Sequence, residues 1–94
     1  MAATGGMSRD RAEWIAAQAL RFIATDGDRL ARFIGLTGIN AGEIRENLDQ
    51  PVFLAGILDY LLEDESLLLE CVESAGCAPE EPAMARAVLA GLTD

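Results

Sequence analysis

Residues 51–76 read PVFLAGILDYLLEDESLLLECVESAG and consist of two apolar helical segments separated by a short acidic break. Apolar side chains fill most positions of 52–62, so a helix there is apolar nearly all round and should lie at the centre of the fold. Pro51 suits the first turn of this helix, where a missing N–H costs little. Asp64 is a typical N-cap for the next helix, which we expect to end at Gly76.

Outward from this stretch, the apolar residues keep the 3.6-residue period of helices, and no segment shows the alternation of a β-strand. Four further helices are expected, at about residues 8–24, 28–37, 40–48 and 79–90. Ser8 is a typical N-cap, Asn40 and Glu43 form a capping-box pattern, and Pro79 opens the last helix. The fold class is therefore all-α, a compact orthogonal bundle of five or six short helices.

The helices also repeat at an offset of 38 residues. Sliding the chain against itself by this distance places Asp26 on Asp64 and Gly38 on Gly76, and it matches the apolar positions of the first helix with those of the fourth. We hypothesise two tandem three-helix units, neither of which buries its apolar face alone. The alternative is the self-similarity that any helical chain shows, and superposition of the two halves distinguishes them.

The length of 94 residues fits one domain with a single core. We expect residues 1–7 to be an arm that is disordered or foreign to the native chain, and residues 8–94 to form a single helical domain. The segment 1–6 lacks the basic and apolar parts of a secretory signal. The longest apolar run, at 52–58, is too short to span a membrane. We therefore expect a cytoplasmic protein.

The chain is strongly acidic: it has 16 aspartates and glutamates and 7 basic residues, which gives a net charge of −9. All seven basic residues are arginines. Nucleic-acid affinity comes largely from cations that neutralise phosphates, so this charge disfavours nucleic acid and, by the same argument, anionic membranes. The expected partner is another protein or a second copy of the chain, with a homodimer as one form.

The absence of histidine removes histidine-based catalytic triads and histidine-containing zinc sites. We expect no enzyme activity, no cofactor and no metal. Carboxylate pairs on one helix face, Asp59 with Glu63 and Glu70 with Glu73, leave small-ligand or divalent-metal binding open as an alternative function. The competing interpretation, a solvated acidic face, is favoured because exposed acids are seldom ligands.

Cys71 and Cys77 should lie near each other at one helix ending. They are either a redox-sensitive pair or two small apolar side chains, since free cysteine is commonly buried. No basic residue lies nearby in sequence to lower a thiol pKa, which favours the second interpretation.

Residues 33–48, FIGLTGINAGEIRENL, have the glycine turn and the apolar spacing of a helix-turn-helix. A DNA-reading helix should offer several side chains to bases and phosphates. Here Arg45 stands beside Glu43 and Glu46, so the charge disfavours a DNA-binding role. It remains an alternative function.

Trp14, Leu67 and Leu69 are the candidate protein-contact residues. On a helical wheel Trp14 lies opposite the core-facing side of its helix, among polar residues. Such a tryptophan is either a binding hot spot or packs over another part of the domain, and we favour the second interpretation. Leu67 and Leu69 widen the apolar surface of their helix beyond one contact face. That surplus indicates either neighbours on two sides or a second chain.

The chain resembles, over about residues 7–77, a family of short alphaproteobacterial proteins known only as a domain of unknown function. The residues that carry the resemblance are MSRD at 7–10, AEWI at 12–15, ALRFI at 19–23, FI at 33–34, LTG at 36–38, IR at 44–45, VFL at 52–54, LDYL at 58–61 and DE at 64–65. The resemblance implies an intracellular bacterial protein without assigned activity. It makes a signalling adaptor one role to consider.

Overall fold

The structure, a computed structural model, describes residues 7–91 of the chain. It contains six helices: α1 (Arg9–Thr25), α2 (Gly27–Thr37), α3 (Ala41–Glu46), α4 (Pro51–Leu62), α5 (Glu65–Ala75) and α6 (Glu81–Gly91). No strand occurs in this part of the chain, which confirms the predicted all-α class.

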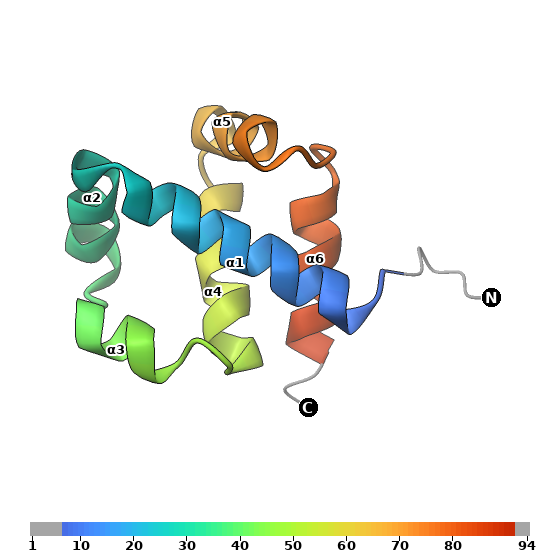
Figure 1. The fold of residues 1–94 in the computed structure, drawn as a ribbon, viewed down its shortest axis with the longest axis horizontal. Helices are drawn as coiled ribbons and strands as arrows, with labels where there is room; N and C mark the ends of the chain where they lie inside the picture. The colour runs from blue at the N-terminus through green and yellow to red at the C-terminus, as the bar shows by residue number, and fades with distance from the viewer. Residues whose placement is uncertain (1–6, 92–94) are drawn as a thin grey trace.

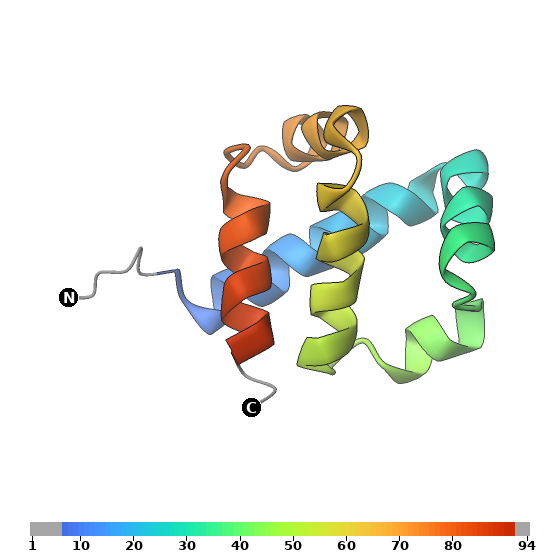
Figure 2. The same cartoon turned by 180° about the vertical axis from the view of Figure 1, so that it is seen from behind.

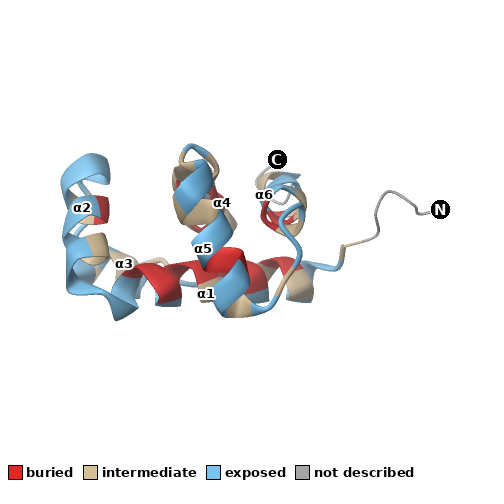
Figure 3. Cartoon of the chain, turned by 90° about the horizontal axis from the view of Figure 1, so that it is seen from above, coloured by how far each residue is buried: buried red, intermediate tan, exposed pale blue. Residues whose placement is uncertain are grey.

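The helices α2, α4 and α6 lie in a row, roughly perpendicular to α1, which crosses α6 and α4 and ends at the start of α2 (Figures 1 and 3). The helices α4 and α6 pack side by side, as the view from behind shows (Figure 2). The helix α5 packs against α1 and α4. The short α3 connects the far end of α2 to the start of α4 (Figure 1).

The helix that organises the core is α1, whereas the sequence indicated α4. The helix α1 contacts α2, α4, α5 and α6, and it buries Ile15, Leu20, Phe22 and Ile23 together with three alanines, Ala12, Ala16 and Ala19. Alanine carries no side chain beyond Cβ, so helices that cross this stripe can approach α1 closely. The helix α4 still buries five residues, but Val52 at its start is 66% exposed.

Side-chain hydrogen bonds confirm the predicted caps at Ser8, Asp64 and Asn40. The Ser8 hydroxyl accepts a hydrogen bond from the Arg11 N–H at 3.0 Å, and the Asp64 carboxylate accepts one from the Leu67 N–H at 3.1 Å. The capping box of Asn40 with Glu43 is complete in both directions. These bonds satisfy backbone donors that the first turn of a helix leaves free.

The start of α6 differs from the prediction, because the helix begins at Glu81 and Pro79 precedes it. The Glu81 N–H donates to the Ala78 carbonyl at 3.0 Å, and the Ala78 N–H donates to the Glu81 carboxylate at 2.9 Å. This reciprocal pair closes a turn around Pro79 before the helix starts. Pro82 is buried in the first turn of α6, as its position allows.

The offset of 38 residues holds for the second helix of each proposed unit. The bounds of α2 and α5 differ by this offset at both ends, both helices start after an aspartate cap, and both end at a glycine with φ of 76°. The third helices differ: α3 has six residues and buries none, whereas α6 has eleven and packs against α1 and α4. The superposition of the two units stays a prediction.

Residues 1–6 of the predicted arm and residues 92–94 lie outside the described range. Met7, which the predicted arm included, is partly buried and packs against the core. Within the described residues, no helix combines the length and the apolar character needed to cross a bilayer.

Candidate interaction groove

A groove of about 630 Å³ lies beside α1 on the side of α3. Its walls come from α1 and from α3 with the link that follows it, and one leucine each from α2 and α4 completes them. The lining residues are Glu13, Ala17, Leu20, Arg21, Ala24, Leu30, Ala41, Ile44, Arg45, Leu48, Asp49 and Leu54. Eight of these twelve are alanine, leucine or isoleucine, so the groove is apolar with a few charged groups.

The α1 wall is one stripe of the helix surface. Glu13, Ala17, Arg21 and Ala24 follow each other at spacings of three or four residues, which places them on one face. Ala17 and Ala24 are exposed, and Leu20 below them is only 9% exposed. On this stripe two small apolar side chains, Ala17 and Ala24, are therefore exposed between Glu13 and Arg21, and no other helix of the described chain covers them.

The α3 wall is the most weakly supported element of the fold. The helix buries no residue, Ile44 is half-buried, and Leu48 just after it is 48% exposed. Its ends are held by the Asn40 capping box and by the Asn47 side chain, which donates to the Glu43 carbonyl at 2.8 Å. A helix of six residues is marginal without tertiary packing, so a partner seated against α3 would stabilise it.

The side chains of two arginines at the groove have no partner within residues 7–91. Arg9, Arg11, Arg29 and Arg86 each form an ion pair with a carboxylate, whereas the guanidinium groups of Arg21 and Arg45 form neither an ion pair nor a hydrogen bond there. Of the three arginines whose side chains are unpaired in the described residues, two thus lie beside one apolar groove, in a chain of net charge −9.

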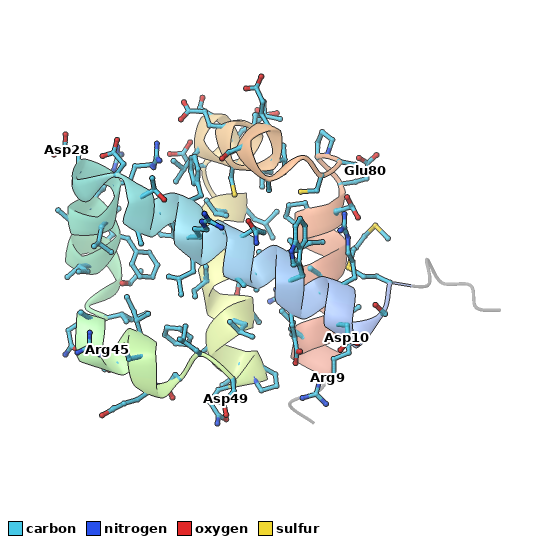
Figure 4. The ribbon with its side chains drawn as sticks, viewed as in Figure 1. Arg9, Asp10, Asp28, Arg45, Asp49 and Glu80 are labelled. Atoms are coloured by element: carbon cyan, nitrogen blue, oxygen red, sulfur yellow. The ribbon has the colours of Figure 1, made fainter. Side chains whose placement is uncertain are left out.

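The two lining carboxylates are less available than the arginines. Glu13 accepts a hydrogen bond from the Arg9 guanidinium at 3.0 Å, and Asp49 accepts one from the Gln50 side chain at 3.4 Å. Arg45 lies on the α2 side of α3, and Asp49 lies near the N-terminal end of α4 (Figure 4). The groove therefore has a basic end near α2 and an acidic end near α4.

None of the three predicted contact residues lines this groove. Trp14 is 39% exposed and Leu69 is 46% exposed, while Leu67 is partly buried and packs against the core. The surplus apolar surface of α5 is thus divided, with Leu67 facing the domain and Leu69 facing outward. Their role as protein contacts stays a prediction.

Trp14 lies against an ion pair between the two ends of the domain. The Arg11 guanidinium stands 4.6 Å from the centre of the Trp14 ring and also donates to the Glu81 carboxylate at 3.1 and 3.2 Å. The hydrogen bond from the Ala78 N–H, and then Arg11, lower the pKa of Glu81. These contacts support the interpretation that Trp14 packs over the contact between α1 and α6.

The two cysteines are free thiols, Cys71 buried and Cys77 half-buried. Burial raises the pKa of Cys71 to about 11, with a further contribution from Cys77. Burial, and then the neighbouring Glu81, also raise the pKa of Cys77. Both groups are therefore held as thiols near neutral pH, which supports their interpretation as small apolar side chains.

The carboxylates of the acidic helix faces are not gathered into a site that could bind a metal ion in the described residues. Within residues 7–91, no three or more aspartate, glutamate or cysteine side chains are grouped so that they could hold a metal ion. Asp59, one member of a predicted pair, instead accepts a hydrogen bond from the Arg86 guanidinium at 2.7 Å. That bond ties α4 to α6.

The helix-turn-helix pattern corresponds to a real turn between two helices. Gly38 ends α2 in the left-handed region, and residues 38–40 connect it to α3. The α3 helix carries Arg45 between Glu43 and Glu46. This arrangement contributes one wall of the groove.

The groove could not be predicted from the sequence, because nothing there marks its apolar residues as one surface. Ala17 and Ala24 lie beside the buried face of α1, between Glu13 and Arg21, and only the position of α3 away from α1 leaves them uncovered. The one available signal was the poor apolar content of 41–46, which marks a helix too short to cover its neighbour.

Comparison with protein families gives a match over most of the chain. A family model described as a protein of unknown function, DUF3572, matches residues 9–92 and thus also covers the C-terminal stretch. No curated protein and no solved structure gives a significant match to the chain.

Proposed function

We propose that this chain, which belongs to the DUF3572 family of proteins of unknown function, is a non-enzymatic module that binds another protein through the groove between α1 and α3. A cytoplasmic location and a role as an adaptor in bacterial signalling are part of the proposal. The groove carries it, because its uncovered apolar walls are the kind of surface that marks a protein-binding site.

Two observations support a protein as the bound species. Leu48, which lines the groove, is 48% exposed, and Ala17, Ala24 and Ala41 on its walls are exposed as well. Apolar walls that stay open to solvent suit a macromolecular partner, whereas a small ligand is usually enclosed by its pocket. The unburied α3 adds a second reason, since a partner packed on it would supply the contacts that it lacks.

Photo-crosslinking in the source cells tests this function. A photoreactive amino acid replaces Leu48 in the groove, and in separate variants it replaces Leu69 on α5 and Leu36 on α2. Leu36 is the matched control because it is an exposed leucine, at 69%, that does not line the groove. We expect a discrete protein adduct from position 48 and none from position 36.

Adducts from position 69 without any from position 48 would move the contact surface to α5, and adducts from neither would refute the proposed function. Light scattering on a size-exclusion column over a range of concentrations then separates the two kinds of partner. A dimer whose adduct has twice the chain mass identifies a second copy, and a monomer identifies a different protein.

A further inference from the structure

We propose that the partner binds as an amphipathic helix, with its apolar side chains on the α1 and α3 walls and its carboxylates on Arg21 and Arg45. This inference rests on the proposed function and specifies the chemistry of the partner. Three features of the structure support it. The helix α6 packs on the part of α4 that corresponds to the groove wall of α1, the side chains of Arg21 and Arg45 are unpaired among the described residues, and the groove is long enough for a helix.

The helix α6 provides an internal example of the binding mode. At the offset of 38 residues, Leu20 and Arg21 of α1 correspond to Leu58 and Asp59 of α4. The helix α6 packs on α4, and its Arg86 binds Asp59 at 2.7 Å. The corresponding third helix of the first unit, α3, is too short to cover α1 in this way.

The stripe of α4 that α6 covers is buried, whereas the corresponding stripe of α1 is exposed to solvent. Ala55 of α4 is 7% exposed, whereas its counterpart Ala17 of α1 is exposed. The stripe of α1 thus corresponds to a surface that binds a helix on α4, but no helix of the described chain packs on it. A partner helix laid there would repeat the α4–α6 packing within the fold.

The charge at this stripe is inverted relative to α4. Asp59 forms an ion pair with a guanidinium of α6, whereas Arg21 occupies the corresponding place on α1 and its guanidinium has no partner among the described residues. Arg45 adds a second free cation from the opposite wall. The complementary helix therefore carries carboxylates, which form charge-assisted hydrogen bonds with guanidinium groups.

The length and direction of the bound helix follow from the walls. From Glu13 to Ala24 the α1 wall is about 16 Å long at 1.5 Å per residue, enough for about three turns of a partner helix. The helix dipole is negative at the C-terminal end, so that end should lie at the basic end of the groove. We expect the carboxylates in the last turns of the partner helix.

A second copy of the chain fits the groove less well than a different protein. Each copy carries a net charge of −9, so two whole copies repel each other at long range more strongly than one copy repels a helix with a few carboxylates. An extended peptide has no sheet edge to pair with in residues 7–91. Helix-in-groove binding is the recognition mode that two apolar helix walls support.

Two synthetic peptides of about 18 residues, long enough to form helix alone, provide the probe. Both carry leucines at spacings of three and four residues; one has glutamates flanking them in its last two turns, and the other has glutamines there. Fluorescence anisotropy measures their binding to the full chain at about 0.15 M salt, which screens the long-range field of the protein. The protein is tested as wild type, as the double variant Arg21→Gln and Arg45→Gln, and as Ile44→Glu.

We expect the glutamate peptide to bind wild type about three- to tenfold more tightly than the glutamine peptide, as for two partly exposed ion pairs. The double variant should remove this difference without weakening the glutamine peptide. The control Arg32→Gln removes a third unpaired arginine, outside the groove, and should keep the difference. The variant Ile44→Glu should weaken both peptides, because it places a charge on the apolar wall.

Equal binding of the two peptides to wild type, or a difference that survives in the double variant, would overturn the inference. Failure of both peptides to bind would overturn it as well. These outcomes are separate from the crosslinking result: adducts at position 48 with no preference for glutamate would leave the protein-binding function standing and exclude only the acidic helix.

Discussion

Arg11 and Glu81 are seventy positions apart in sequence and form a bidentate ion pair that links the first and last helices, α1 and α6. The Arg11 Nε donates to one oxygen of the Glu81 carboxylate at 3.2 Å, and Nη2 donates to the other at 3.1 Å. The same carboxylate accepts the Ala78 N–H, and the Trp14 ring lies over the guanidinium. One glutamate thus caps the start of α6 and attaches it to α1.

Glu81→Gln should lower the melting temperature at neutral pH, because glutamine can still accept the Ala78 N–H but cannot pair with Arg11 as an anion. The pKa of Glu81 is lowered in the folded state, so its contribution is present above the ordinary value of 4.5 and is lost as the pH falls through the folded value. The difference between variant and wild type should therefore shrink in acid. Thermal unfolding followed by circular dichroism from pH 7 to about pH 3 measures it.

The control for this pair is Glu80→Gln, since Glu80 is exposed and its side chain has no partner among the described residues. It should leave the melting temperature nearly unchanged over the same pH range. A deficit of Glu81→Gln that stays constant into acid would show that Arg11 does not bind the ionised carboxylate.

Truncation of Leu58, which is fully buried in α4, should destabilise the domain strongly. Leu58→Ala removes buried methyl groups and leaves a cavity, so we expect a loss of about 2–5 kcal/mol in the free energy of unfolding. Leu36→Ala changes a leucine that is 69% exposed and should stay within about 0.5 kcal/mol of wild type. Urea unfolding measures both, and similar losses for the two variants would contradict the packing described for α4.

Local features of this fold could be predicted from the sequence because short-range physics fixes them. The core-facing stripe of α1, with Ile15, Ala19 and Ile23, follows from the 3.6-residue period, and the structure buries all three. The caps at Ser8 and Asp64 follow from the need of the first turn for acceptors. Each of these depends only on residues within one or two turns.

Features that depend on distant residues could not be predicted. The start of α6 at Glu81 depends on a turn around Pro79 that the Arg11 pair reinforces from the other end of the chain. The central role of α1 depends on how closely other helices approach its alanines. The groove exists because α3 lies away from α1, and periodicity within each helix carries no information about that separation.

Alkylation of the native protein should discriminate between the two cysteines. With a pKa raised to about 11, Cys71 has on the order of one thiolate in a thousand at pH 8, and its burial blocks access. Iodoacetamide at pH 8 should therefore leave Cys71 unmodified, react slowly with the half-buried Cys77, and modify both in urea. Peptide mass spectrometry measures the two sites. Equal native rates at both would refute the buried placement of Cys71.

Glycine-to-alanine substitutions should change stability in opposite directions at Gly76 and Gly56. Gly76 ends α5 with φ of 76°, where a Cβ strains the backbone, so Gly76→Ala should cost about 1–2 kcal/mol. Gly56 lies within α4, is exposed, and has open space where a Cβ would stand. Alanine there restricts the unfolded chain and favours helix, so Gly56→Ala should gain about 0.4–1 kcal/mol.

The matched position Gly38, which ends α2 with the same φ of 76°, should behave like Gly76. Urea unfolding of the three variants compares them directly. A loss at both Gly38 and Gly76, with a gain at Gly56, would show that the turns after α2 and α5 use the same left-handed glycine. A gain at Gly76 would instead mean that α5 ends without one, and the correspondence between the two turns would then fail.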